Sequence, residues 1–131
     1  MAFTVLIVDD SPVMRAFIRR VMRLAGFEEA WYLEAGNGEE GLASLAVQHV
    51  DVILTDINMP RMNGEDFLRE LRKNPAYERI PALVISTDAT HERVDRMLEL
   101  GAQGYISKPF PPEALREELD RILGAYDGIG D

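Results

Sequence analysis

Two adjacent carboxylates follow the first apolar run of the chain. The stretch "VLIV" (5–8) is typical of a buried strand, and Asp9 and Asp10 come directly after it, with no basic residue before Arg15. Two like charges ~4 Å apart repel each other by about 4 kcal/mol at an effective dielectric constant of ~20. We therefore expect another part of the chain, or a bound cation, to compensate this negative charge.

Other reactive side chains occupy equivalent positions after later apolar runs. Asp56 ends "DVILTD", Ser86 ends "ALVIS" and Lys108 follows "GYIS". In an open parallel sheet the carboxyl ends of the strands lie along one edge, and ligands bind there. The sequence therefore predicts that these three residues and the two N-terminal acids lie together at one edge of a sheet.

The elements that position these residues follow from short apolar runs alternating with amphipathic segments. The apolar runs are rich in β-branched residues and flanked by turn formers, which predicts strands at 3–8, 30–35, 51–55, 82–86 and 104–107. Helical spacing predicts five helices, which follow Ser11-Pro12, cover 38–46, 64–73 and 90–100, and start again at Pro111-Pro112. Ser11 is suited to cap the first helix and Pro12 to occupy its first position.

Five strands alternating with five helices predict an α/β, doubly wound (βα)5 fold, in which helices cover both faces of a five-stranded parallel sheet. The 131 residues are enough for one domain. We assign residues 1–125 to this domain. Residues 126–131 lack any periodicity and are expected to form a frayed tail.

Composition and charge narrow the possible functions. The net charge of -9 argues against nucleic-acid binding, which depends on Lys and Arg to neutralise phosphates, and favours cations and basic partner surfaces. The chain has no cysteine and no apolar run near the ~18 residues of a membrane span. We expect a cytoplasmic monomer without a membrane or nucleic-acid partner.

Three carboxylates at one edge form an oxygen-rich site for a hard divalent cation such as Mg²⁺. Together with Mg²⁺ and Lys108, the acids Asp9, Asp10 and Asp56 carry no net charge, so a phosphoryl group can approach. Asp56, which precedes an exposed loop, is the best candidate for a nucleophile that becomes an aspartyl phosphate. Metal and lysine can stabilise the phosphoryl oxygens, and the Ser86 hydroxyl can donate to them.

Each residue alone also has an ordinary structural explanation. The double acid could belong to a helix-capping loop and Asp56 to an Asx turn, while Lys108 could lie in a solvated loop and Ser86 could simply end a strand. Two other functions remain open at this point. One is a phosphatase of small phosphomonoesters with an Asp nucleophile and Mg²⁺. Such enzymes require a second acid two residues after the nucleophile, where this chain has Asn58. The other is a flavodoxin-like cofactor binder, which the acidic edge disfavours.

Four stretches carry a family resemblance: "VDDS" (8–11), "DINMPRMNG" (56–64), "ALVIST" (82–87) and "GAQGYISKPF" (101–110). In these stretches the chain resembles the receiver domain of bacterial response regulators, most closely the single-domain, CheY-like chemotaxis type. The resemblance covers about residues 3–124. It implies a flavodoxin-like, CheY-like fold with strand order 2-1-3-4-5, an order taken from the family and not from the sequence pattern.

The resemblance also implies roles for the site residues. Asp56 would be the phosphoacceptor. The Mg²⁺ ligands would be Asp10 and Asp56, with Asp9 acting through water and the backbone carbonyl of Asn58 completing the set. Lys108 would contact the phosphoryl group and precede a cis peptide bond to proline, the residue that makes such a bond accessible. Ser86 and Tyr105 would form a switch pair.

The family implies two protein partners. A histidine kinase would supply the phosphoryl group, and the surface of the fourth helix, fifth strand and fifth helix would control a flagellar switch, a phosphotransfer protein or a kinase. An intermediate phosphorelay shuttle is the alternative. The resemblance implies a signalling protein with slow self-dephosphorylation and not an enzyme. Three residues depart from the family pattern, namely Ile57, Thr87 and Glu118, and the last weakens the flagellar assignment.

Overall fold

The computed structural model describes residues 2–124. Five parallel strands form one sheet in the order β2-β1-β3-β4-β5. The strands are β1 (Thr4–Val8), β2 (Trp31–Ala35), β3 (Val52–Thr55), β4 (Ala82–Ser86) and β5 (Gly104–Ser107). The predicted α/β fold and strand order are confirmed, and each strand lies within one residue of its predicted bounds. The predicted tail, 126–131, lies outside the described residues.

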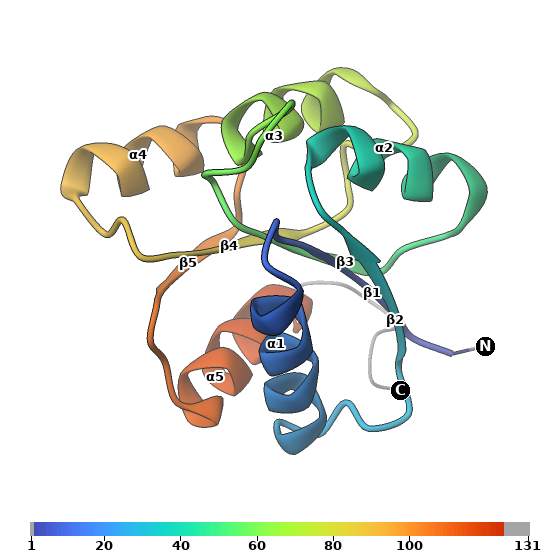
Figure 1. Ribbon diagram of the computed structural model, residues 1–131, viewed down its shortest axis with the longest axis vertical. Helices are drawn as coiled ribbons and strands as arrows, with labels where there is room; N and C mark the ends of the chain where they lie inside the picture. The colour runs from blue at the N-terminus through green and yellow to red at the C-terminus, as the bar shows by residue number, and fades with distance from the viewer. Residues whose placement is uncertain (1, 125–131) are drawn as a thin grey trace.

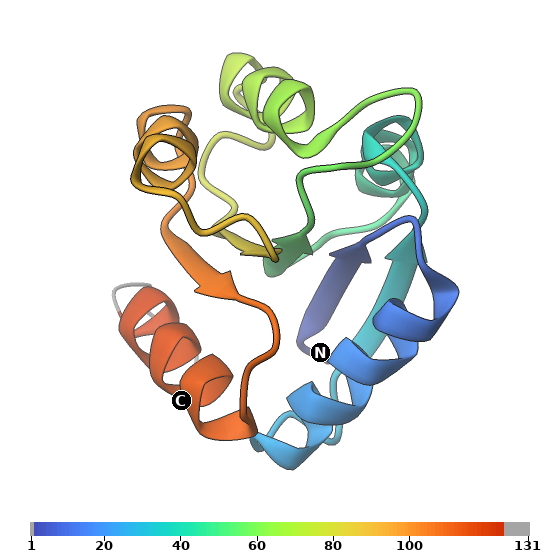
Figure 2. The ribbon, with the colours of Figure 1, turned by 60° about the vertical axis from the view of Figure 1, so that its left-hand side comes forward.

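One helix follows each strand, and together the helices cover both faces of the sheet (Figure 1). They are α1 (Pro12–Leu24), α2 (Gly38–Val47), α3 (Gly64–Lys73), α4 (His91–Glu99) and α5 (Pro112–Leu123). Helices α1 and α5 lie on one face, and α2, α3 and α4 lie on the other, as the rotated view in Figure 2 also shows. Among residues 2–124, no helix is long and apolar enough to cross a membrane.

The sheet separates two apolar cores. Side chains of β1 alternate between them, so that Val5 and Ile7 pack with α1 and α5 while Leu6 and Val8 pack with α2 and α3. Every residue of β1, β3 and β4 is buried. This double burial explains why these strands read as continuous apolar runs and not as alternating ones.

Side-chain caps fix the helix starts at the carboxyl edge of the sheet. The Ser11 hydroxyl accepts a hydrogen bond from the backbone N–H of Met14 at 3.2 Å, as predicted for an N-cap. Asn37, Asn63 and Thr90 cap α2, α3 and α4 in the same way. Because these caps stand in the loops that follow the strands, they hold the loops that carry the candidate site.

Candidate functional site

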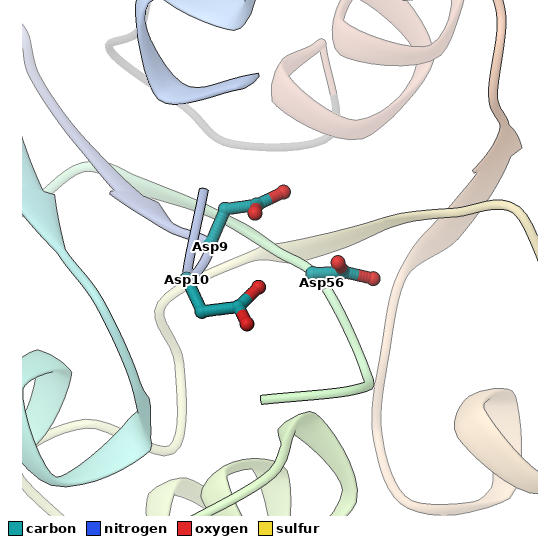
Figure 3. A group of neighbouring side chains, drawn as sticks. All are labelled: Asp9, Asp10 and Asp56. Carbon is teal, nitrogen blue, oxygen red and sulfur yellow. The ribbon is translucent and has the colours of Figure 1, made fainter. Parts of the chain in front are cut away.

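Three acids from two neighbouring strands lie together at the carboxyl edge of the sheet. One carboxylate oxygen from each of Asp9, Asp10 and Asp56 lies within 4.8 Å of the others, and Figure 3 shows the three side chains at the ends of β1 and β3. Asp9 is buried, Asp10 is exposed and Asp56 is intermediate. Such a set of oxygens in partial contact with solvent fits the donors that a hard divalent cation prefers.

The sheet register places two of these acids side by side. Val8 at the end of β1 pairs with Thr55 at the end of β3, so Asp9 and Asp56 follow a matched pair of residues. The Asp56 N–H donates to the Val8 carbonyl at 2.9 Å, which continues the ladder to the acid itself. The closeness of the carboxylates is therefore a property of the backbone and not of flexible side chains.

Lys108 supplies the positive charge that the acid pair requires. Its Nζ lies 3.0 Å from Asp9 Oδ2 and 3.2 Å from Asp56 Oδ2, and the lysine side chain is only 10% exposed. The Lys108 N–H donates to the Ser86 carbonyl at 2.8 Å, which fixes the lysine at the end of β5. The predicted cis peptide bond between Lys108 and Pro109 is confirmed. A bridging lysine reduces the repulsion between the acids without blocking Asp10.

The environment of Asp56 makes its carboxyl group harder to ionise than an exposed aspartate. Burial raises the pKa of the Asp56 carboxyl, and the charge of Asp9 raises it further. Two groups lower this pKa. One is the Ile57 N–H, which donates to Asp56 Oδ1 at 2.7 Å, and the other is the Lys108 ammonium. A cation bound between the acids would therefore help to keep Asp56 ionised and nucleophilic.

Gly64 closes the loop that follows Asp56. Its N–H donates to the Ile57 carbonyl at 2.8 Å, and a Cβ at this position would lie 2.2 Å from the Asp56 carbonyl oxygen. No residue with a side chain fits there without a backbone shift. The start of α3 therefore packs directly on the backbone of the candidate nucleophile. This role cannot be read from the sequence alone, although "MNG" stands in the motif.

Ser86 and Tyr105 meet at one residue, Asp88. The Ser86 hydroxyl is fully buried and accepts from the Asp88 N–H at 3.2 Å, while the Tyr105 hydroxyl donates to the Asp88 carbonyl. Burial raises the pKa of the Tyr105 phenol. Asp88 is not among the residues predicted from the sequence, although an acid two residues before a helix cap is a signal for a structured loop.

The residues that depart from the family pattern have distinct positions. Ile57 is buried in the core beneath α3. Thr87 is exposed and lines an apolar groove of ≈ 450 Å³ beside the site, together with Val13, Met14, Phe17, Lys108, Pro109 and Phe110. Glu118, on α5, forms an ion pair with Arg121 at 2.6 Å. Asn58 is exposed two residues after Asp56, and its role as a carbonyl ligand stays a prediction.

Comparison with known proteins shows the family. The model of the response regulator receiver domain matches residues 5–120, and the chain belongs to this family. It is 38% identical over 123 residues to the chemotaxis protein CheY1 of Helicobacter pylori. The matched region covers 93% of this chain and 98% of that protein. The chemotaxis response regulator CheY4 of Vibrio cholerae has a similar structure, with a TM-score of 0.83, 33% identity, and coverage of 94% of this chain and 100% of that one.

A further structural neighbour bears on the metal. The receiver domain of the sensor histidine kinase PA1611 from Pseudomonas aeruginosa matches with a TM-score of 0.83 and 27% identity, over 95% of this chain and 99% of that one. That structure is described with a magnesium ion coordinated in its active-site cleft. The comparisons identify this chain as a CheY-like response regulator receiver domain, a class of signalling protein, and do not favour the phosphatase alternative.

Proposed function

We propose that this protein is a phosphorylation switch of a two-component pathway in chemotaxis. In this proposal a histidine kinase phosphorylates Asp56 with the help of Mg²⁺, and the surface of α4, β5 and α5 then controls a partner protein. A cytoplasmic location, a monomeric state and slow self-dephosphorylation are parts of the same proposal. The observation that carries it is the shared contact of Lys108 with Asp9 and Asp56, at 3.0 and 3.2 Å, beside a third acid.

The candidate residues divide the chemistry between them. Asp10, Asp56 and the backbone carbonyl of Asn58 would hold the cation directly. Asp9 would contact it through a water molecule. When bound, Mg²⁺ supplies positive charge that stabilises the phosphoryl oxygens during transfer. An Asp56 carboxylate oxygen attacks phosphorus, the bond to the leaving nitrogen of the kinase phosphohistidine breaks, and the electron pair of that bond goes to the imidazole. Lys108 Nζ then exchanges its contact with Asp56 for one with the phosphoryl group.

The switch follows from the bonds around Asp88. The Ser86 hydroxyl accepts from the Asp88 N–H, and its proton is available for a phosphoryl group on Asp56. In this proposal the hydroxyl turns toward the phosphoryl group, and this turn moves its oxygen away from the Asp88 N–H. The loop before α4 then loses one of its anchors, and the Tyr105 ring can move to a second position. Phosphorylation thus shifts the population between two states of the α4, β5 and α5 surface.

The direct test is labelling with acetyl phosphate, a small phosphodonor, followed by intact mass measurement. We expect the wild-type protein to gain one phosphoryl group in Mg²⁺ and none in a chelator. Asp56→Asn should abolish this gain, while Asp95→Asn, which changes an exposed acid on α4, should leave it intact. Mg²⁺-dependent labelling of Asp56→Asn at the wild-type rate would remove Asp56 from the proposed role.

The partner can be sought with a phosphate mimic. Beryllofluoride complexes the phosphoacceptor carboxylate of proteins that form acyl phosphates, so a pull-down with and without it compares the two states. We expect a motility or chemotaxis protein to bind in the beryllofluoride state alone. Equal capture in both states would contradict a phosphorylation-dependent output.

A further inference from the structure

Arg15 reaches back from α1 to the peptide bond that joins the two N-terminal acids. Its Nη1 donates to the Asp9 carbonyl oxygen at 2.6 Å, and this carbonyl belongs to the peptide unit between Asp9 and Asp10. The Arg15 side chain is only 18% exposed. The first basic residue after the acid pair thus contacts the backbone that sets the direction of both acids.

The guanidinium of Arg15 is also held from the opposite side. Its Nε lies 3.0 Å from Glu34 Oε1, and the other Glu34 oxygen forms an ion pair with Arg19. Glu34 stands on β2, next to β1 in the sheet. Because one guanidinium joins a side chain of β2 to a carbonyl at the end of β1, its position is defined by two separate elements.

The two acids differ in how their own side chains are fixed. Asp9 Oδ1 accepts from the Ser11 N–H at 2.9 Å, and Asp9 Oδ2 lies 3.0 Å from Lys108 Nζ. Within residues 2–124 the structure shows no hydrogen bond or ion pair for the side chain of Asp10, which is exposed. The direction of the Asp10 carboxylate, seen beside Asp56 in Figure 3, therefore depends on the backbone at residues 9 and 10.

From these contacts we propose that Arg15 is a positioning residue of the metal site. It fixes the plane of the Asp9–Asp10 peptide, so that the Asp10 carboxylate faces Asp56 before a cation arrives. This role rests on the proposed function, since it requires that Asp10 and Asp56 bind the cation. Groups that orient the ligands of a metal typically change its affinity by about 10–100-fold when they are removed.

Positioning and simple charge make opposite predictions for Arg15. A nearby positive charge repels Mg²⁺, so loss of charge alone should tighten binding of the cation. Loss of a positioning contact should weaken it. The sign of the change therefore separates the two explanations, and Arg20 supplies a matched control because it is an exposed arginine on the same helix.

The experiment measures Mg²⁺ binding to the full chain by titration of backbone amide NMR signals. For Arg15→Gln we expect about 10-fold weaker binding than wild type, and for Arg20→Gln unchanged or slightly tighter binding. Arg15→Lys keeps the charge but not the two-sided contact, so it should also bind weakly. In acetyl phosphate labelling, Arg15→Gln should require more Mg²⁺ for its half-maximal rate and reach the wild-type rate at saturation.

Two results would overturn the role of Arg15 in different ways. If wild type binds Mg²⁺ and both Arg15 variants bind it equally well or more tightly, Arg15 does not position the site, and the proposed function stands. If wild type binds no Mg²⁺, the proposed function fails, and the role of Arg15 fails with it. Amide signals of the strands serve to verify that each variant is folded.

Discussion

The phenol of Tyr105 donates a hydrogen bond to the backbone carbonyl of Asp88, in the loop between β4 and α4. The N–H of the same residue donates to the hydroxyl of Ser86 at 3.2 Å. Both backbone groups of Asp88 are thus bound by the two residues of the proposed switch pair. This arrangement links the end of β4, which lies beside β3 in the sheet, to β5.

Tyr105→Phe removes one of these two bonds. We expect the loop from Thr87 to Thr90 to open more readily, by about 0.5–1.5 kcal/mol, because a hydrogen bond of this kind contributes about that much. Hydrogen exchange of the loop amides measures the change. Tyr32→Phe is a matched control, since the Tyr32 hydroxyl donates to the Phe27 carbonyl at 2.5 Å, away from the site. Equal exchange of the loop amides in wild type and Tyr105→Phe would contradict the link.

The pKa of Asp56 predicts a pH dependence of stability. Burial raises this pKa above its ordinary value of 3.8, so the folded state binds the proton more tightly than the unfolded state does. Stability therefore falls as the pH rises from 3.8 through the raised pKa. Asparagine does not ionise, so Asp56→Asn does not lose stability in this way and should be more stable than wild type at neutral pH.

Urea unfolding in a chelator, over a series of pH values, measures this effect. The advantage of Asp56→Asn should shrink as the pH falls and vanish below 3.8, where the acid becomes protonated in both states. Added Mg²⁺ should stabilise the wild type and reduce the advantage at neutral pH. If the difference in stability between wild type and Asp56→Asn did not vary with pH, ionisation of Asp56 would not destabilise the folded state.

Lys108→Met tests how the acid cluster is compensated. The variant leaves Asp9 and Asp56 without their common cation, and we expect a loss of about 1–3 kcal/mol of stability, because both acceptors are largely buried. Mg²⁺ should restore most of this loss, since the ion replaces the missing charge. Urea unfolding with and without Mg²⁺ measures both effects.

Lys73→Met provides the control for this variant, because Lys73 is an exposed lysine that pairs with Glu70 on α3. It should have little effect in either condition. If Mg²⁺ stabilised Lys108→Met no more than wild type, the lysine and the metal would not act on the same acids.

Helix α4 depends on charged contacts more than its neighbours do. Of its residues, all of which are described, Met97 alone is buried, whereas α3 buries four residues. Glu65 on α3 accepts from Arg96 at 2.6 Å and lies 3.5 Å from Arg93. The Arg96 guanidinium, through its hydrogen bond, holds the pKa of Glu65 below its usual value.

Glu65→Gln should therefore loosen α4, with up to about fivefold faster amide exchange across its length, because exposed ion pairs contribute about 1 kcal/mol or less. Salt near 1 M should have a similar effect on wild type, since the Debye length is then ~3 Å. Glu70→Gln, which breaks a pair within α3, is the control. Exchange in α4 that is insensitive to both the substitution and salt would show that apolar packing alone holds this helix.

The sequence is sufficient to predict the helices and strands and the edge of the sheet at which the site lies. Periodicity predicted the ten helices and strands, and the rule that parallel strands end at one edge predicted that Asp9, Asp10 and Asp56 meet. These inferences succeed because they depend on the backbone. The register of Val8 with Thr55 was not predicted, yet it sets how closely the acids approach.

The contacts that depend on side-chain reach were beyond the sequence analysis. In the sequence, Arg15 is only the first basic residue after the acids, and nothing in its spacing shows that it binds the Asp9 carbonyl and Glu34 together. Asp88 was missed because its backbone, not its carboxylate, meets Ser86 and Tyr105. Such roles become visible once the loops have been placed in space.

The most direct test of the central claim is a crystal structure of the protein with Mg²⁺ and beryllofluoride. The account predicts Mg²⁺ between the carboxylates of Asp10 and Asp56, beryllium on an Asp56 oxygen, and Lys108 Nζ in contact with a fluorine. Beryllium on another acid, or an acid cluster that binds no cation at saturating Mg²⁺, would contradict it.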